Sequence, residues 1–315
     1  MIDKTKIVKG VLLSLIPLFS FSCFIFVLGI YLGQPFNVID SNDTLASLTN
    51  QERISNWSLS PISEKEYSDV GEEISQDLSK KESELKSAVS IKMSQLQESE
   101  ILFEKDSDLK LPIASLTKLM SAIICIENYD LKQKVSVDKE ADSMPPMRID
   151  IKEGQTYSVE ELLNIMLVES SNKAAYALSE IMGVDKFVSA MNDKAIELGF
   201  KNSFFADSTG LSQSNVSTVR DLALLAEYII NKFPEISYIT TQKTYSLPYL
   251  GEISNTNKML DELYNVVLSK TGFTNYANGC LLMVLATPDG GYTINVVLGA
   301  NDRFLEMKKI INSQQ

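Results

Sequence analysis

The chain has 315 residues, of which 44% are hydrophobic and 22% charged, a balance typical of a folded globular protein. Its formal net charge of −12 argues against a nucleic-acid partner, because phosphate binding needs clustered lysines and arginines. The absence of histidine excludes Ser-His-Asp and Cys-His mechanisms, and three scattered cysteines do not supply the usual metal-ligand sets, so we expect no metal or organic cofactor.

The first element expected along the chain is an apolar segment without charges, residues 10–32. It is long enough to cross about 30 Å of hydrocarbon. Lysines precede it and acidic residues follow it, so the positive-inside rule places residues 1–9 in the cytoplasm. The sequence therefore predicts a single transmembrane helix, with everything that follows on the extracytoplasmic side of a cell membrane.

Residues 33–86 are polar and rich in serine and glutamate, and from residue 34 onward they contain eleven acidic and five basic residues. We interpret this segment as a solvated acidic stalk. An alternative is a helix that packs on the following domain or on a second copy, because apolar residues recur there at helical spacing: Tyr67, Val70, Ile74, Leu78 and Leu85.

From residue 87 to 315 the pattern predicts one folded α+β domain. Alternating apolar residues in 88–93, followed by residues 100–105, indicate a hairpin. Two apolar strands, 279–287 and 292–300, are joined by a tight turn. Helical periodicity predicts five helices between these strands: 115–129, 159–168, 173–182, 185–198 and 218–232. We therefore expect one sheet that contains both ends of the domain, with a helical insertion. Cys125 and Cys280 are interpreted as buried, unpaired residues.

Ser115 and Lys118 lie three positions apart, so their side chains share one face of the expected helix. A serine at the first helical turn also meets free backbone N–H groups. Lysine can act as its base only if its pKa falls by about 3 units from about 10.4, which burial and a second cation can supply. The structural alternative is a capping serine with an outward-reaching lysine, since the same spacing occurs five times in the chain.

Two later stretches bear on this choice. Ser170 and Asn172 lie at the start of another expected helix, and Lys270, Thr271 and Gly272 lie just before the apolar strand pair. Alone, the first pair is typical of helix capping and the second group of a surface turn. In this order, however, the three stretches match serine–lysine enzymes that act on D-Ala-D-Ala peptides or penicillins.

Longer blocks carry a family resemblance. The blocks LPIASLTKLMSA, IKEGQTYSVEELLNIMLVESSNKAAYALSE, FVSAMNDKAIELGFKNSFFADSTGLS, NTNKML and SKTGFTNYANGCLL resemble those of D-alanyl-D-alanine carboxypeptidases, the low-molecular-mass penicillin-binding proteins of bacteria. The resemblance covers roughly residues 87–312. It implies a β-lactamase/transpeptidase-like fold, a mostly antiparallel sheet flanked by helices with a helical subdomain.

The resemblance also implies roles for individual residues. Ser115 corresponds to the acylated nucleophile, Lys118 to its base, and Ser170 to the hydroxyl that relays a proton to the leaving group. The backbone N–H groups of Ser115 and Phe273 would form the oxyanion hole.

Substrate binding is implied for five further residues. Asn172 would hold the substrate backbone, and Lys270 would keep the site positive and help to lower the pKa of Lys118. Thr271 and Arg303 would meet the terminal carboxylate, while Gly272 would let the substrate approach the strand.

We therefore expect a membrane-anchored serine carboxypeptidase that removes the terminal D-Ala from peptidoglycan stem peptides and is acylated by β-lactams. One alternative is a D,D-endopeptidase that cuts cross-links, and another is a class A β-lactamase, although no clear acidic loop to activate water is found. A third is a catalytically silent wall-binding homologue, favoured by Lys173, which stands where the family commonly has an acid and adds a positive charge beside the site.

Overall fold

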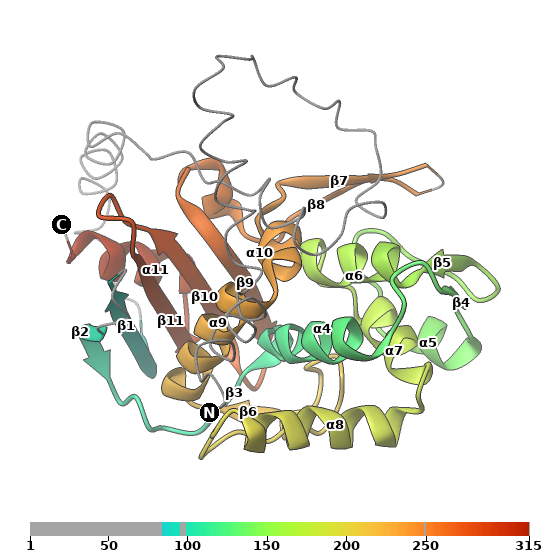
Figure 1. Ribbon diagram of the computed structural model, residues 1–315, viewed down its shortest axis with the longest axis horizontal. Coiled ribbons are helices and arrows are strands. Elements are labelled where there is room, and N and C mark those ends of the chain that lie inside the picture. The colour runs from blue at the N-terminus through green and yellow to red at the C-terminus, as the bar shows by residue number, and fades with distance from the viewer. Residues whose placement is uncertain (1–83, 95–98, 249, 315) are drawn as a thin grey trace, which may run out of the picture. The chain divides into compact units, whose positions relative to one another are not determined.

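The computed structural model describes residues 84–94, 99–248 and 250–314 (Figure 1). The predicted cytoplasmic tail, the transmembrane segment 10–32 and nearly all of the stalk lie outside these residues, so these assignments stay predictions. Within the described ranges, none of the helices combines the length and apolar character that crossing a bilayer requires.

Five strands form the main sheet, and every neighbouring pair is antiparallel. In sheet order they are β2 (Ser99–Lys105), β1 (Ser87–Met93), β11 (Tyr292–Ala300), β10 (Asn278–Ala286) and β9 (Val266–Thr274). Strand β1 therefore lies beside β11, as Figure 1 shows, which confirms that one sheet holds both ends of the domain.

Both faces of the sheet are buried, and this explains why β10 is a nearly continuous apolar run. Leu282 and Val284 belong to the larger core, whereas Leu281 and Met283 belong to a smaller one. Helix α11 (Arg303–Asn312) covers the smaller core, and helices of the insertion cover the other face.

Between the hairpin and β9 the chain forms helices and short strand pairs. The helices are α4 (Thr117–Asn128), α5 (Lys139–Ser143), α6 (Val159–Val168), α7 (Asn172–Glu180), α8 (Val184–Glu197), α9 (Val219–Lys232) and α10 (Pro234–Thr241). The 3-10 turns are η3 (Ala114–Leu116) and η4 (Lys258–Asp261). The short strands pair as β3 (Leu111–Pro112) with β6 (Val216–Ser217), β4 (Lys134–Ser136) with β5 (Thr156–Ser158), and β7 (Thr244–Leu247) with β8 (Gly251–Ser254).

All five predicted helices are present, with ends shifted by a few residues. Helix α6 starts at a capping box in which Ser158 and Glu161 satisfy each other's backbone N–H groups. Three helices were not expected: α5 is only five residues long, α10 starts with Pro234, and α11 follows the last strand directly. Cys125 and Cys280 are buried and unpaired, as predicted.

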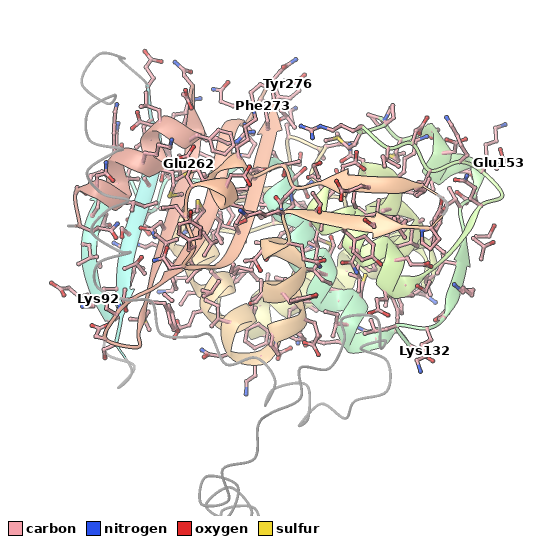
Figure 2. The ribbon with its side chains drawn as sticks, turned by 90° about the horizontal axis from the view of Figure 1, so that it is seen from above. Lys92, Lys132, Glu153, Glu262, Phe273 and Tyr276 are labelled. Atoms are coloured by element: carbon pink, nitrogen blue, oxygen red, sulfur yellow. The ribbon has the colours of Figure 1, made fainter. Side chains whose placement is uncertain are left out.

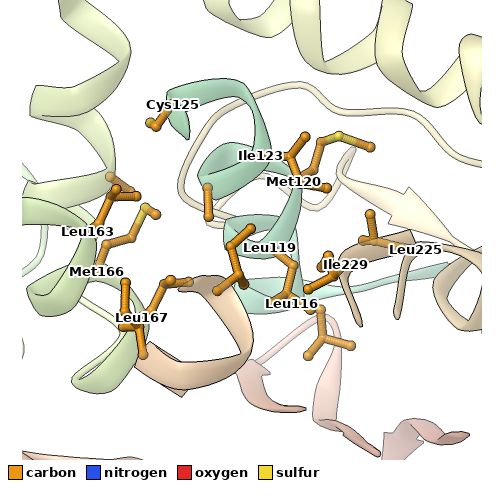
Figure 3. Packing of buried hydrophobic residues seen from close by; sticks show 14 of the residues in the cluster. Leu116, Leu119, Met120, Ile123, Cys125, Leu163, Met166, Leu167, Leu225 and Ile229 are labelled. Carbon is orange, nitrogen blue, oxygen red and sulfur yellow. The ribbon is translucent and has the colours of Figure 1, made fainter. Parts of the chain in front are cut away.

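Helix α4 lies in the middle of the helical layers and is buried on nearly all sides. Figure 3 shows its apolar side chains between those of α6, such as Met166, and those of α9, such as Ile229. Lys118 is on this helix and is 0% exposed. The lysine that the sequence singled out is therefore fully buried among apolar side chains.

Candidate active site

Ser115 lies in the 3-10 turn η3, immediately before α4. The sequence predicted a helix from residue 115, but the α-helix begins at Thr117. Ala114, immediately before Ser115, has a φ of 47°, which falls in the left-handed region. The side chains of Ser115 and Lys118 still meet, because Lys118 Nζ lies 3.1 Å from Ser115 Oγ.

The amino group of Lys118 has three partners that can each accept a hydrogen bond. Besides Ser115 Oγ, these are Asn172 Oδ1 at 2.8 Å and the Thr209 carbonyl at 2.5 Å. Burial lowers the pKa of Lys118 to about 7, although the charge of Asp207 acts in the opposite direction. A neutral amine has two N–H groups and one lone pair. If Asn172 and Thr209 accept the N–H groups, the lone pair is left to face Ser115.

A second buried lysine, Lys270, binds the hydroxyl of Ser170. Its Nζ donates to Ser170 Oγ at 2.9 Å and to the Thr271 carbonyl at 3.1 Å. Burial lowers the pKa of Lys270 well below its usual value, and the positive charges of Lys118 and Arg303 lower it further. Burial is the largest cause of the lowered pKa for both lysines. The expectation that Lys270 lowers the pKa of Lys118 stays a prediction.

Ser170 and Asn172 do not cap α7, because Ser171 does. The hydroxyl of Ser171 accepts the backbone N–H of Ala174 at 3.3 Å. Ser170 has a left-handed backbone with a φ of 67°. The side chains of Ser170 and Asn172 are therefore directed to Lys270 and Lys118 respectively, and the capping alternative is wrong for both residues.

Lys270, Thr271 and Gly272 belong to the edge strand β9 rather than to a turn before the strand pair. Gly272 packs against η3, since a Cβ at this position would lie 3.2 Å from the backbone nitrogen of Ser115. The Thr271 hydroxyl lies 2.5 Å from that of Thr256. Phe273 is 59% exposed, and Figure 2 shows its side chain at the end of β9. The edge strand β9 thus lies directly beside Ser115.

Arg303 is the first residue of α11, and its guanidinium carbon lies 4.7 Å from the centre of the Phe304 ring. Its Nε is buried and has no hydrogen-bond partner among the described residues. Arg303 packs on strand β10 beside β9, because a Cβ on Gly279, the partner of Phe273 in the sheet, would lie 3.0 Å from Arg303 Cβ. Its charge also contributes to lowering the pKa of Lys270. The structure thus brings all the predicted site residues to one region, where β9 meets the helical layers.

Residues 75–302 match the family model described as D-alanyl-D-alanine carboxypeptidase. The chain belongs to this family. It is 36% identical over 194 residues to the D-alanyl-D-alanine endopeptidase of Pseudomonas aeruginosa, an alignment that covers 58% of this chain and 62% of that protein. It is 33% identical over 233 residues to the D-alanyl-D-alanine carboxypeptidase DacF of Bacillus subtilis, with 69% and 58% coverage. The chain therefore spans less than two thirds of the length of both relatives.

A solved structure confirms the fold. Penicillin-binding protein D2 from Listeria monocytogenes, crystallised in its cefotaxime-bound form, is 28% identical and superposes with a TM-score of 0.67. The match covers 73% of this chain and 97% of that one. The fold is therefore the transpeptidase-like arrangement of this family, with an antiparallel sheet and flanking helices.

Asp207 lies in one of the sequence blocks that resemble the family, but the sequence did not predict that it lies near Lys118. Its carboxylate accepts four hydrogen bonds: from Thr209 N and Oγ1 at 2.7 and 2.8 Å, and from Gly210 N and Ser212 N at 2.7 Å each. Burial raises the pKa of Asp207, but these hydrogen bonds outweigh burial and hold it below its usual value. The loop so formed presents the Thr209 carbonyl to Lys118. The only sequence signal is the Asp-Ser-Thr-Gly run, which is typical of a tight turn.

Lys173 does not leave an uncompensated charge beside the site. Its side chain is 3% exposed and ion-paired with both Asp142 and Asp150. Its Nζ also donates to the Ile151 carbonyl at 3.2 Å. The expected cation is therefore present, but two carboxylates neutralise it.

A separate group of carboxylates lies near β4 and the end of α7. Ligand oxygens of Asp138, Glu140 and Glu180 are within 4.8 Å of one another, and Asp138 and Glu180 line a cavity of about 260 Å³. Burial, a hydrogen bond to Asp138 and the charges of Asp138 and Glu140 raise the pKa of Glu180 to about 8. The closeness of the three side chains thus favours the protonated form of Glu180 near neutral pH.

Proposed function

We propose that this chain is a serine D,D-peptidase of peptidoglycan, which attacks stem peptides ending in D-Ala-D-Ala and removes the terminal D-Ala. The observation that carries the proposal is the placement of Ser115 3.1 Å from a fully buried lysine whose pKa is lowered to about 7. A hydroxyl needs a neutral base of this kind to become a nucleophile near neutral pH.

In the acylation step, Ser115 Oγ attacks the carbonyl carbon between the two D-alanines while its proton passes to Lys118 Nζ. The carbonyl oxygen becomes an oxyanion, which the backbone N–H groups of Ser115 and Phe273 would receive. The packing of Gly272 against the backbone of Ser115 supports this pairing, because it brings β9 beside the nucleophile. Asn172 and Thr209 hold the amine of Lys118 throughout.

Collapse of the tetrahedral intermediate breaks the amide bond, and the leaving D-Ala nitrogen takes a proton from Ser170. Ser170 takes up in exchange the proton that Lys118 received from Ser115, so that Lys118 is neutral again. The amine of Lys270 positions Ser170 for this transfer, because its Nζ lies 2.9 Å from the Ser170 oxygen. Water then attacks the Ser115 ester, which releases the shortened peptide and restores the hydroxyl.

The substrate's terminal carboxylate would be received by Thr271 and Arg303 beside Lys270. Support comes from the buried Nε of Arg303, which has no partner among the described residues, and from the positive charge of its guanidinium. Substrate binding brings a carboxylate into this low-dielectric region and compensates that charge.

An endopeptidase that cuts cross-linked stem peptides is the second candidate. It is favoured by the similarity to the P. aeruginosa endopeptidase, which is 36% identical over the aligned residues. The two activities use the same chemistry and differ in what lies beyond the scissile bond. Release of D-Ala from a pentapeptide, compared with cleavage of a cross-linked dimer by the same preparation, distinguishes them.

The proposal that Ser115 is acylated is tested by labelling with fluorescent penicillin. Wild-type protein should form a covalent adduct. The variants Ser115→Ala and Lys118→Ala should not, and circular dichroism should verify that both variants are folded. Absence of labelling in folded wild type would support a silent wall-binding homologue instead. Rapid hydrolysis of the penicillin without a long-lived adduct would support a β-lactamase.

We also propose that residues 10–32 anchor the enzyme in the bacterial cell membrane, so that the domain acts on wall peptides outside the cytoplasm. The supporting observation is the uncharged length of this segment with lysines before it. Membrane fractionation of the full chain and of a chain lacking residues 1–33 tests this, since only the former should sediment with membranes.

A further inference from the structure

Lys173 follows Asn172 in α7, yet it is bound into a separate cluster of charges, in which Lys152 pairs with the same two aspartates as Lys173. Its side chain is 3% exposed and pairs with Asp142 and Asp150. Burial lowers the pKa of Lys173, but hydrogen bonds to both aspartates outweigh burial and hold it above its usual value. A buried cation is tolerated only with such compensation, so Lys173 is a charged anchor point at neutral pH.

The cluster ties down residues 144–151, which form neither helix nor strand between α5 and β5. Side chains from the 169–173 region bind the backbone of this segment. The Pro145 carbonyl accepts from Asn172 Nδ2 at 3.3 Å, and the Ile149 N–H donates to Glu169 Oε1 at 2.6 Å. The Ile151 carbonyl accepts from Lys173 at 3.2 Å. Segment 144–151 and the Ser170–Asn172 motif are therefore held together as one unit.

This unit reaches the proposed base through the amide of Asn172. Its Oδ1 accepts from Lys118 at 2.8 Å, while its Nδ2 donates to the Pro145 carbonyl at 3.3 Å. These two contacts define which way the amide faces. If segment 144–151 moved, Nδ2 would lose its acceptor, and a rotated amide would present N–H groups to the N–H groups of Lys118. Such a misalignment of the base is costly, because a shift of about 1 Å can reduce a rate about 100-fold.

We propose that Lys173 is a positioning residue of the catalytic site: with Asp142 and Asp150 it anchors segment 144–151, so that the Pro145 carbonyl fixes the Asn172 amide against Lys118. The inference rests on the proposed function, since it requires that Lys118 is the base. It gives a role to a position at which the family resemblance led us to expect an acid, and the role depends on positive charge.

The first test compares Lys173→Met and Lys173→Arg with a matched control, Lys194→Met. Lys194 is also mostly buried, at 12% exposure, and pairs with two carboxylates, Glu127 and Glu197. We expect Lys173→Met to slow acylation by fluorescent penicillin about 10- to 100-fold at a temperature where it is folded. Lys173→Arg should restore most of the rate. Lys194→Met should lower Tm but leave the acylation rate within about twofold.

The second test asks whether Lys173 acts through Asn172. Adding Lys173→Met to Asn172→Ala should change the acylation rate less than about twofold, because no amide remains to be positioned. An equal loss in both backgrounds, or an unchanged rate in Lys173→Met alone, would overturn the inference. If Lys173→Met does not fold, Asp150→Asn is used in both backgrounds, with a smaller loss expected in the same direction. Wild type that does not label would instead refute the proposed function and this inference with it, whereas labelled wild type with an unaffected variant refutes the inference alone.

Discussion

The pH dependence of acylation is the most direct test of Lys118 as the base. Burial lowers its pKa from 10.5 to about 7, a shift that corresponds to about 5 kcal/mol. At pH 7 about half of the protein then carries a neutral amine, compared with about one molecule in 3,000 for an unperturbed lysine. The buried position of Lys118 therefore accounts for about a thousandfold in the reactive fraction.

The assay is the second-order rate constant for fluorescent penicillin between pH 5 and 9, measured together with Tm to exclude unfolding. About 3% of Lys118 is neutral at pH 5.5 and about 76% at pH 7.5, so the rate should rise about 25-fold between them and level off above pH 8. Lys118→Arg should lack this acid limb, because its guanidinium stays protonated. A rate that is flat from pH 5.5 to 7.5, or that rises only near pH 10, would refute the reasoning.

Three further predictions follow from the same residues. Because the folded pKa of Lys118 lies below its unfolded value, the unfolded chain binds more protons between pH 7 and 10.5, and wild-type stability rises with pH in that window. In denaturant titrations, the stability of Lys118→Met relative to wild type should therefore fall by about 2 kcal/mol between pH 7 and 9, and a constant difference would contradict this. Asp207→Asn removes a charge that opposes the neutral form, so the acid limb of acylation should move to lower pH, and a move to higher pH would contradict this assignment. Gly210→Ala should lower the free energy of unfolding by more than about 3 kcal/mol and abolish labelling, because its Cβ would lie 2.1 Å from the Ala114 carbonyl oxygen. In the control Gly154→Ala the φ is similar but the Cβ would meet open space, so the loss should be about 1–2 kcal/mol. Equal losses of stability in the two variants would exclude a steric cause.

The sequence predicted that one sheet contains strands from both ends of the domain, and it predicted five helices, because local periodicity indicates these elements. It predicted the grouping of the site residues because the family blocks contain them. It did not predict that Lys270 and its neighbours lie within β9. The polar run Ser-Lys-Thr-Gly breaks the apolar pattern, and an edge strand can tolerate this break since one side of it is unpaired. Helix α5 is too short for a periodic signal.

Other properties of the site depend on tertiary structure and are not encoded locally. The partners of Lys173 lie 31 and 23 positions earlier in the chain, so its neutralisation could not be inferred from its neighbours. The lowered pKa of Lys118 requires complete burial, which the apolar residues around it suggest but do not establish. Asp207 acts by folding its own loop, and this resembles an ordinary turn in the sequence.

The proposed nucleophile meets its proposed base only where four distant stretches of chain, around residues 115, 171, 208 and 271, have come together. An unfolded or half-folded molecule keeps the same hydroxyl but has no neutral amine beside it. Covalent capture by a β-lactam therefore counts correctly assembled molecules one by one. If Ser115 is acylated as proposed, the same reagent can report what fraction of newly made chains has folded.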